Sequence, residues 1–431
     1  MSRAGEIKEW AVCRVCGNDK LTPVLSLGDL CASDFLAPGE EHLARAYPLT
    51  LVLCDKGGGG CGLLQLKHTV SPETLYRNYW YRSGMNTSMT RELHGIARKA
   101  ESLLDLRERD FVLDIAANDG TLLRGYHTSG IRLTGFEPAK NLAEYNAVGT
   151  DRIIPEFFDA KLWEDEFGGQ KVKVITAIAM FYDLENPNQF VADAAKILDD
   201  EGIFIIQMSY LPLMLSQNAF DNILHEHLEY YSLLALESLL ARHGLEAFDV
   251  ELNDVNGGSF RIYIRHKGKG KTIRVSEGAY ERLQNLRNEE EQSGLHTKTI
   301  YDEFVARVHN TKDKVVDFIK REKENGKTTY VYGASTKGNT LLQFFNLNHT
   351  LITAAAERNP DKWGKKTVAT NIPIISEEEA RTAMPDYFLV LPWHFLGEFK
   401  EREIDFLRRG GKFIVPLPIP HLHDGEKEIY L

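Results

Sequence analysis

The chain has 431 residues, of which 43% are hydrophobic and 26% are charged, and its formal net charge is −11. A chain of this length and composition is globular and too long for a single core, so we expect two or three domains. The acidic balance argues against a protein that binds nucleic acid, because neutralising phosphates requires clustered Lys and Arg. A small anionic ligand stays compatible with this charge, since it needs only a local basic or amide-lined pocket.

The sequence contains no segment that predicts membrane insertion or export. Arg3, Glu6, Lys8 and Glu9 interrupt the N-terminal residues, and no stretch approaches about 18 uninterrupted apolar residues. We therefore expect a cytoplasmic protein with no membrane partner. The sequence does not determine the oligomeric state, and a monomer is the favoured expectation.

All the cysteines lie in the N-terminal part of the chain. One pair is a CxxC, and a second, wider pair encloses the glycine run 57–60, which can loop out without steric cost. Four thiolates from two turns match a closed tetrahedral zinc site, whereas unligated buried cysteines or a redox pair are the alternatives. Cys31 stands alone, and we expect it to be a small buried hydrophobe. The predicted ligands of a structural zinc ion are Cys13, Cys16, Cys54 and Cys61.

The middle of the chain, from about residue 110 to 245, alternates apolar runs with helical stretches. This rhythm predicts an α/β domain with a parallel sheet. The strand-like runs are 111–115, 133–136, 172–177 and 202–207.

The C-terminal part begins with a strand-like run at 260–265, and residues 276–323 have the charge and spacing of long exposed helices. A strand, a turn of small residues and a helix then follow at 328–342. Later strand-like runs at 387–391 and 412–416 indicate a second Rossmann-like sheet.

The turn after the first predicted strand has the features of a cofactor site. Asp114 ends the strand, small residues follow it, and Glu137 ends the next strand, where a carboxylate can accept two ribose hydroxyls. No GxGxxG is present and Asp119 would repel a pyrophosphate, so S-adenosylmethionine is favoured over a nicotinamide cofactor. Met180 and Phe181 follow a later strand, and packing is the alternative role for them. The predicted cofactor-binding residues are Asp114, Ala116, Asn118, Asp119, Gly120, Glu137, Pro138, Met180 and Phe181.

The run His225-Glu226-His227 concentrates imidazoles and a carboxylate, which favours acid–base chemistry. The two imidazoles would share one face of a strand, but would point roughly 200° apart on a helix. Two alternatives remain: a turn whose histidines are solvated or satisfied in the core, and a metal site made by both histidines with Glu229.

Residues 333–340, Gly-Ala-Ser-Thr-Lys-Gly-Asn-Thr, place amides, hydroxyls and one ammonium at the start of a helix. Such a site suits an anion, and a diphosphate is the natural occupant. It is not a Walker loop, because Gly338 follows Lys337, and a plain tight turn is the alternative. Trp393 and His394 end a later strand, where ligands of such sheets collect.

Together these motifs resemble the zinc-containing, S-adenosylmethionine-dependent sugar C-methyltransferases, which methylate C-3 of nucleotide-linked 4-keto-deoxy sugars. The resemblance covers nearly the whole chain and includes the four cysteines, 118–123, 225–227, 333–340 and 391–395. It implies an α/β protein with three domains: a zinc-binding unit at 1–75, a class I methyltransferase Rossmann-like core at 76–248, and a C-terminal Rossmann-like domain at 249–431 that helps to hold the sugar nucleotide.

Three positions depart from the family pattern. Ala116 replaces a usual Gly, Cys54 and Cys61 lie further apart than usual, and Leu224 stands where some relatives carry a Tyr. The last departure concerns how the sugar is oriented.

The chemistry that the resemblance implies begins with removal of a proton beside a ketone. His227 is the predicted base, because imidazole titrates close to working pH. Glu226 would orient the sugar or the imidazole, and Tyr79 or Tyr81 would donate to the developing oxyanion, with aromatic packing as the alternative. Predicted catalytic residues are His225, Glu226, His227, Tyr79 and Tyr81; predicted substrate-binding residues are Asn222, Ser335, Lys337, Asn339, Trp393 and His394.

Three rival functions stay open from the sequence. The first is a methyltransferase that acts on RNA or protein, which the acidic net charge disfavours. The second is an oxidoreductase or epimerase that holds a dinucleotide at the C-terminal glycine turn. A non-catalytic protein that binds a sugar nucleotide is the third.

Overall fold

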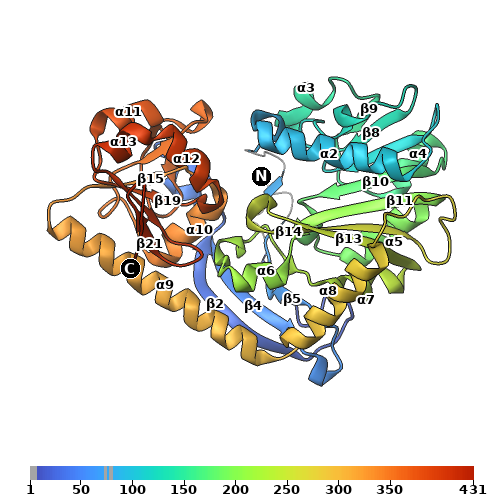
Figure 1. The fold of residues 1–431 in the computed structure, drawn as a ribbon, viewed down its shortest axis with the longest axis horizontal. Helices are drawn as coiled ribbons and strands as arrows, with labels where there is room; N and C mark the ends of the chain where they lie inside the picture. The colour runs from blue at the N-terminus through green and yellow to red at the C-terminus, as the bar shows by residue number, and fades with distance from the viewer. Residues whose placement is uncertain (1–6, 72–74, 77–80) are drawn as a thin grey trace.

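The computed structural model describes residues 7–71, 75–76 and 81–431 (Figure 1). Two α/β lobes lie side by side, and a long N-terminal hairpin together with helix α9 (Lys298–Glu324) runs beneath both of them. The α/β fold class with a second C-terminal sheet is therefore confirmed. Within the described residues, no helix has the length and apolar character needed to cross a membrane.

The first lobe is built on a seven-stranded sheet with the order β13-β14-β11-β10-β7-β8-β9. Its central strands run parallel, and β14 and β13 add an antiparallel edge. The strands are β7 (Phe111–Ile115), β8 (Arg132–Phe136), β9 (Arg152–Ile154), β10 (Val172–Ile178), β11 (Leu198–Ser209), β13 (Leu245–Asn253) and β14 (Ser259–His266).

Helices cover both faces of this sheet, because neighbouring residues of a strand point to opposite faces. Val112 and Val174 pack in the cluster formed by α2, whereas Leu113 and Ile175 pack with α4, α5, α7 and α8. The continuous apolar runs in the sequence reflect this two-sided burial. The helices are α2 (Thr87–Leu103), α3 (Ala143–Asn146), α4 (Ala160–Phe167), α5 (Pro187–Ile197), α6 (Leu211–Ser216), α7 (Leu233–Arg242) and α8 (Ala279–Ser293).

The second lobe carries another seven-stranded sheet, with the order β18-β16-β15-β19-β20-β21-β22. Its first five strands are parallel and its last two are antiparallel. The strands are β15 (Thr329–Tyr332), β16 (Ala355–Glu357), β18 (Ile374–Ser376), β19 (Tyr387–Val390), β20 (Lys412–Val415), β21 (His421–His423) and β22 (Glu428–Tyr430). The helices are α10 (Thr336–Phe345), α11 (Glu377–Ala383), α12 (Leu396–Arg402) and α13 (Ile404–Arg408).

The charged stretch 276–323 forms helices α8 and α9, as expected, and much of their surface is exposed, but one face of each helix is buried. Helix α9 buries Tyr301, Phe304 and Val308 in the same core cluster as the N-terminal hairpin and the second lobe. Its abundant charged residues occupy only the face that is left in solvent.

The N-terminal unit pairs its backbone with both lobes. Its sheet has the order β12-β5-β4-β2, and β12 is supplied by the first lobe. A second pairing joins β3 to β17 of the second lobe. The strands are β1 (Lys8–Glu9), β2 (Leu21–Cys31), β3 (Phe35–Leu36), β4 (Ala46–Cys54), β5 (Leu64–Leu66), β6 (His68–Thr69), β12 (Glu229–Tyr230) and β17 (Lys366–Thr367).

The four cysteines of the two predicted pairs converge. The Sγ atoms of Cys13 and Cys61 are 3.6 Å apart and those of Cys16 and Cys54 are 3.4 Å apart, and all four lie within 4.8 Å of one another. Zn–S bonds of about 2.3 Å in a tetrahedron separate sulfurs by about 3.8 Å, so the cluster fits zinc. A Cβ at Gly60 would lie 2.5 Å from Cys54 Sγ, which explains a glycine at this position.

Zinc is expected to hold this unit together. Removing zinc with a chelator, or changing Cys54 to Ser, should lower the Tm by more than about 10 °C. Several kcal/mol of metal-binding free energy are then lost, and each kcal/mol of stability corresponds to about 2–4 °C in Tm. Differential scanning calorimetry with zinc analysis measures this. Cys31→Ser is the matched control and should leave both the Tm and the zinc content unchanged; an equal Tm with and without zinc would contradict a structural role.

Candidate active site

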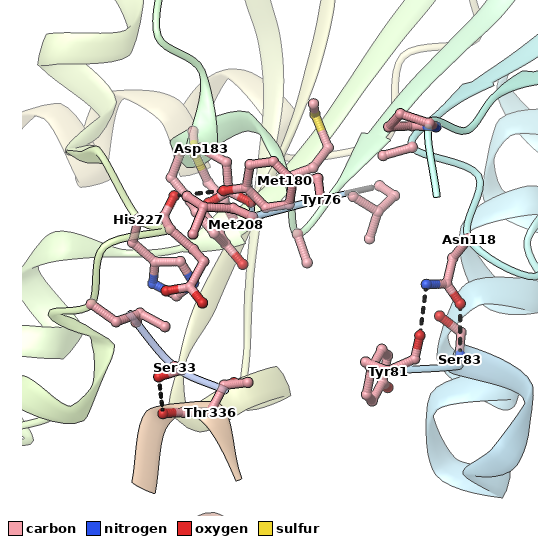
Figure 2. A pocket seen from close by; sticks show the side chains of 18 of the residues that line it. Ser33, Tyr76, Tyr81, Ser83, Asn118, Met180, Asp183, Met208, His227 and Thr336 are labelled. Atoms are coloured by element: carbon pink, nitrogen blue, oxygen red, sulfur yellow. Dashed lines mark hydrogen bonds between the residues drawn. The ribbon is translucent and has the colours of Figure 1, made fainter. Parts of the chain in front are cut away.

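A cavity of about 710 Å³ lies where the N-terminal unit and the two lobes meet. Its walls include Ser33 and Asp34 of the N-terminal unit, the carboxyl ends of β7, β8, β10 and β11, and Thr336 at the start of α10 (Figure 2). Ligands of open α/β sheets bind at the carboxyl ends of the strands, and this volume is typical of small-molecule sites.

Two carboxyl groups line the cavity at the ends of β7 and β8. Asp114 Oδ1 accepts a hydrogen bond of 2.6 Å from the Thr176 hydroxyl, and burial raises the pKa of Asp114 to about 7. Glu137 accepts hydrogen bonds from the backbone amides of Asn118 and Ala139 at 2.7 and 2.8 Å, and burial raises its pKa to about 7. This end of the cavity is therefore acidic, which suits a cationic ligand better than a pyrophosphate.

The turn between these strands has an unusual backbone. Ala116 and Asn118 have φ values of 58° and 51°, in the left-handed region. This conformation favours glycine, and neither residue is a glycine. Gly120 has a φ of 77°, and a Cβ there would lie 2.9 Å from Arg124 Nη1. The turn thus curls tightly around the end of β7, and both Ala116 and Asn118 line the cavity.

Asp119 and Gly120 shape this turn and are not among the residues that line the cavity. The Asp119 carboxylate accepts a hydrogen bond of 2.7 Å from the Gly84 amide. The Asn118 side chain accepts from the Ser83 amide and donates to the Tyr81 carbonyl, both at 3.0 Å (Figure 2). Asn118 and Asp119 therefore fasten the segment around residues 81–84 beside the strand ends.

The other predicted cofactor residues divide into two groups. Pro138 and Met180 line the cavity, together with Met208. Phe181 is fully buried, and its ring packs against Phe190 and Tyr231 with centroid distances of 5.6 and 5.4 Å. The alternative of plain core packing therefore describes Phe181.

His227 lines the cavity and has a fixed orientation. Its Nδ1 lies 2.9 Å from the Asn222 carbonyl oxygen, which can only accept, so Nδ1 carries the hydrogen and Nε2 keeps its lone pair. The Tyr182 ring packs against the imidazole, and the centroids of the two rings are 4.3 Å apart. Burial and the charge of Lys337 lower the pKa of His227 to about 3. The expectation that this imidazole titrates near working pH is therefore wrong: it is neutral there.

Glu226 also lines the cavity. Its Oε2 is buried and has no hydrogen-bond partner among the described residues. Burial raises the pKa of Glu226 to about 7. This carboxyl group, and not the imidazole, changes its charge near neutral pH.

His225 is not among the cavity-lining residues. Its Nε2 lies 3.1 Å from the Tyr47 carbonyl oxygen, and burial lowers its pKa to about 4. It joins the segment to the N-terminal unit. Among the described residues, the four cysteines are the only group of His, Cys, Asp or Glu arranged to hold a metal, so the alternative of a histidine metal site is not supported.

Two tyrosines and one aspartate complete this part of the site. Tyr81 lines the cavity, whereas Tyr79 lies outside the described residues. Sequence reasoning missed Tyr76, whose hydroxyl donates a hydrogen bond of 3.0 Å to the Glu226 carbonyl oxygen, and Asp183. The signal for Asp183 was its position just after strand β10, at the edge of the sheet where ligands collect.

The predicted substrate residues of the second lobe mainly join the lobes. Lys337 Nζ donates to Asn222 Oδ1 at 2.6 Å, and Trp393 Nε1 donates to Asp221 Oδ2 at 3.1 Å. Asn339 donates to the Asp34 carbonyl oxygen at 3.0 Å. Among the six predicted substrate residues, only Ser335 and Lys337 line the cavity; the others are Asn222, Asn339, Trp393 and His394.

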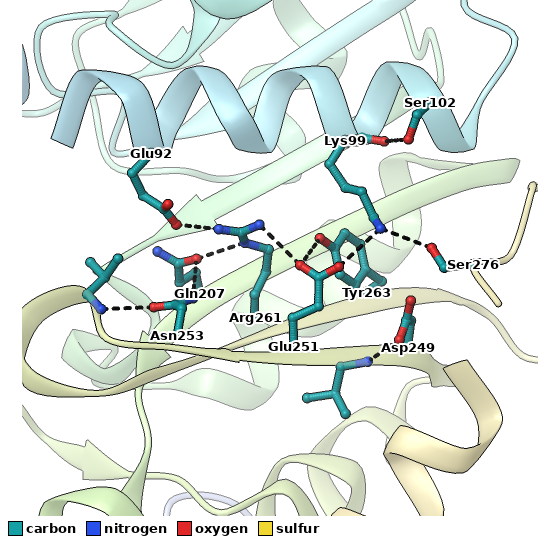
Figure 3. A network of polar contacts seen from close by, with 12 residues as sticks. Glu92, Lys99, Ser102, Gln207, Asp249, Glu251, Asn253, Arg261, Tyr263 and Ser276 are labelled. Atoms are coloured by element: carbon teal, nitrogen blue, oxygen red, sulfur yellow. Dashed lines mark hydrogen bonds and ion pairs between the residues drawn. The ribbon is translucent and has the colours of Figure 1, made fainter. Parts of the chain in front are cut away.

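A polar network holds helix α2 against the sheet of the first lobe (Figure 3). Arg261 donates to Gln207 at 2.8 Å and to Glu251 at 3.3 Å, and it also binds Glu92 of α2. Lys99 of α2 pairs with Glu251 at 3.1 Å. Because Gln207 lines the cavity, this network fixes one of its walls.

Known protein families and one relative match this chain over nearly its whole length. Family models match a zinc binding domain at residues 13–76, a methyltransferase domain at 81–250 and a C-methyltransferase C-terminal domain at 254–418. The C-methyltransferase NovU of Streptomyces niveus is 30% identical over 423 residues, which are 97% of this chain and 98% of that protein.

Solved methyltransferase structures also match part of the chain. The plantazolicin methyltransferase BpumL, in complex with SAH, is 14% identical over 43% of this chain and 87% of its own, with a TM-score of 0.34. The magnesium protoporphyrin IX methyltransferase of Synechocystis PCC 6803, with bound SAM, is 10% identical over 41% of this chain and 79% of its own, with a TM-score of 0.31.

The cofactor is S-adenosylmethionine, and the acidic end of the cavity fits it. Asp114, Glu137 and the Asn118 turn would hold its ammonium and ribose, and the lining Lys and Arg residues come from other walls. Zinc fits the four cysteines. Because the family models and the relative are methyltransferases, the oxidoreductase, epimerase and non-catalytic alternatives are set aside. The chain belongs to the family of S-adenosylmethionine-dependent C-methyltransferases with an N-terminal zinc-binding domain.

Proposed function

We propose that this enzyme methylates C-3 of a nucleotide-linked 4-keto-deoxy sugar through an enolate. The observation that supports this most is the charge distribution of the cavity described above. Its acidic end, at Asp114 and Glu137, suits the cofactor, whereas Arg45, Lys337 and Lys362 come from the other walls and suit a diphosphate. The cavity volume of about 710 Å³ can hold both ligands together.

The proposed reaction starts with a proton that a neighbouring ketone makes acidic. His227 Nε2 accepts this proton from C-3, the C–H electron pair forms a C=C bond, and the carbonyl electron pair moves onto oxygen. The hydrogen bond from Nδ1 to the Asn222 carbonyl keeps the ring oriented for this transfer. Glu226, with its unpartnered Oε2, accepts a hydrogen bond from a sugar hydroxyl. When bound, S-adenosylmethionine supplies an electrophilic methyl group.

The function is tested with dTDP-, UDP-, CDP- and GDP-linked 4-keto-deoxy sugars and methyl-labelled S-adenosylmethionine. We expect one of them to take up a single methyl group on C-3, as located by NMR. In deuterium oxide without the methyl donor, the same substrate should exchange its C-3 hydrogen, because proton removal precedes methylation. A methyl group on oxygen or nitrogen, or no uptake by any of these sugars, would contradict the proposal.

His227→Gln should lower methyl transfer by about 10²-fold or more, because general-base catalysis contributes at least that much. C-3 deuterium exchange should fall in parallel, while the affinity for S-adenosylmethionine, measured by calorimetry, stays near wild type. His266→Gln is the matched control, since His266 contacts the Leu198 carbonyl away from the cavity, and it should keep full activity. Wild-type exchange in His227→Gln would remove the imidazole as the base.

The pH dependence should follow Glu226. Because burial raises its pKa to about 7, the group is protonated below that pH and becomes a hydrogen-bond acceptor above it. At saturating cofactor, kcat/KM should therefore rise between about pH 6 and 8. Glu226→Gln should be slower and should lack this rise, because an amide does not titrate. The assignment fails if the variant keeps the same acidic limb.

A further inference from the structure

Asp183 lines the same cavity as Glu226 and His227 but has no part in the chemistry described so far. It is the last residue of the 3-10 turn Phe181–Asp183, and its backbone amide donates to the Met180 carbonyl at 3.0 Å. Figure 2 shows its side chain among Tyr76, Met180 and Met208, on the side of the cavity that carries His227. Its Oδ1 is buried and has no hydrogen-bond partner among the described residues.

The groups around Asp183 are mostly acidic. Glu226 and Glu229, in the neighbouring segment, both act electrostatically on Asp183. Arg14 is a nearby cation, but it lies 3.7 Å from Glu229 and pairs with that residue. In the described part of the chain, neither Asp183 nor Glu226 forms an ion pair with Lys, Arg or His. Burial and the two glutamates raise the pKa of Asp183 well above its usual value, and the Tyr76 hydroxyl opposes them only in part.

Burial without a cation favours the neutral form of a carboxyl group, because an isolated charge loses its hydration. Two carboxyl groups that share one cavity also repel each other when both are ionised, so their proton affinities separate. The pKa of Glu226 rises to about 7, whereas burial and the two glutamates raise that of Asp183 well above its usual range. The buried position of Asp183, with no ion pair among the described residues, therefore favours its protonated form, which is a hydrogen-bond donor, beside a Glu226 that ionises to an acceptor.

We infer that Asp183 is a neutral carboxylic acid that donates a hydrogen bond to the carbonyl oxygen of the substrate. This inference rests on the proposed function, in which that oxygen becomes negative when His227 removes the C-3 proton. Asp183 keeps its proton throughout, and its hydrogen bond strengthens as the oxygen gains charge. The C=O bond reforms when C-3 takes the methyl group, whose bond to sulfur would break and leave its electron pair on the sulfur of a neutral thioether. The proton on His227 then leaves to solvent.

The test compares Asp183→Asn with Asp183→Ala. Asn retains an N–H donor of similar shape but cannot ionise, so kcat should stay within about tenfold of wild type. Ala removes the donor and should lower kcat by roughly 10²-fold, as loss of one oxyanion donor does. C-3 deuterium exchange should follow kcat, and cofactor affinity should not change. Asp193→Asn, on helix α5 outside the cavity lining, is the matched control and should match wild type.

An equal loss in Asp183→Asn and Asp183→Ala would overturn the inference, because the ionised form would then be the active one. Infrared spectroscopy tests the protonation state without any substrate. At about pH 8, the difference spectrum between wild type and Asp183→Asn should contain the C=O stretch of a protonated carboxyl, and the difference spectrum between wild type and Glu226→Gln should not. The absence of that stretch from the first difference spectrum would also overturn the inference. A wild-type enzyme inactive on every keto sugar would defeat the proposed function, while the infrared result would still decide the state of Asp183.

Discussion

The backbone of Leu228 fixes the candidate active site, because two parts of the protein hold it at once. Its carbonyl accepts a hydrogen bond of 2.8 Å from the amide of Leu66 in the N-terminal unit, and its own amide donates to the Tyr182 carbonyl of the first lobe at 2.7 Å. His227 is the preceding residue. Backbone hydrogen bonds on both sides leave its chain little freedom, so the imidazole is positioned before any ligand binds.

The zinc-binding turn reaches this segment through Arg14, which lies between two of the cysteines. The buried guanidinium donates to the Leu66 carbonyl at 2.5 Å and lies 3.7 Å from Glu229, whose carboxylate is also fully buried. A buried carboxylate without its cation is strongly destabilising. Arg14 thus links the turn that carries two of the zinc ligands to Glu229, two residues from His227.

The sequence predicted well what depends on local pattern. The strand 111–115, the turn around Asn118 and the cysteine cluster follow from apolar runs, small residues and ligand spacing. It named His227 as the base but also counted His225 as catalytic, and only His227 lines the cavity. Their segment is neither strand nor helix, so no periodicity showed that His225 turns to the Tyr47 carbonyl instead. Lys337 lines the cavity, as expected of a phosphate ligand, but local sequence could not show that its ammonium also contacts Asn222, 115 positions away in the chain.

The low pKa of His227 shapes the proposed reaction. A weakly basic imidazole alone would be a poor base for a carbon acid, because proton transfer is most efficient when the proton donor and the proton acceptor have similar pKa values. Its low affinity, however, belongs to the protein without substrate, where burial and the charge of Lys337 oppose a second cation. Once negative charge forms on the substrate oxygen, the same low dielectric strengthens the attraction between that oxygen and the imidazolium. Proton transfer from the substrate to the buried imidazole therefore creates an ion pair whose two charges compensate each other. Catalysis then depends on stabilising the oxygen more than on the strength of the base.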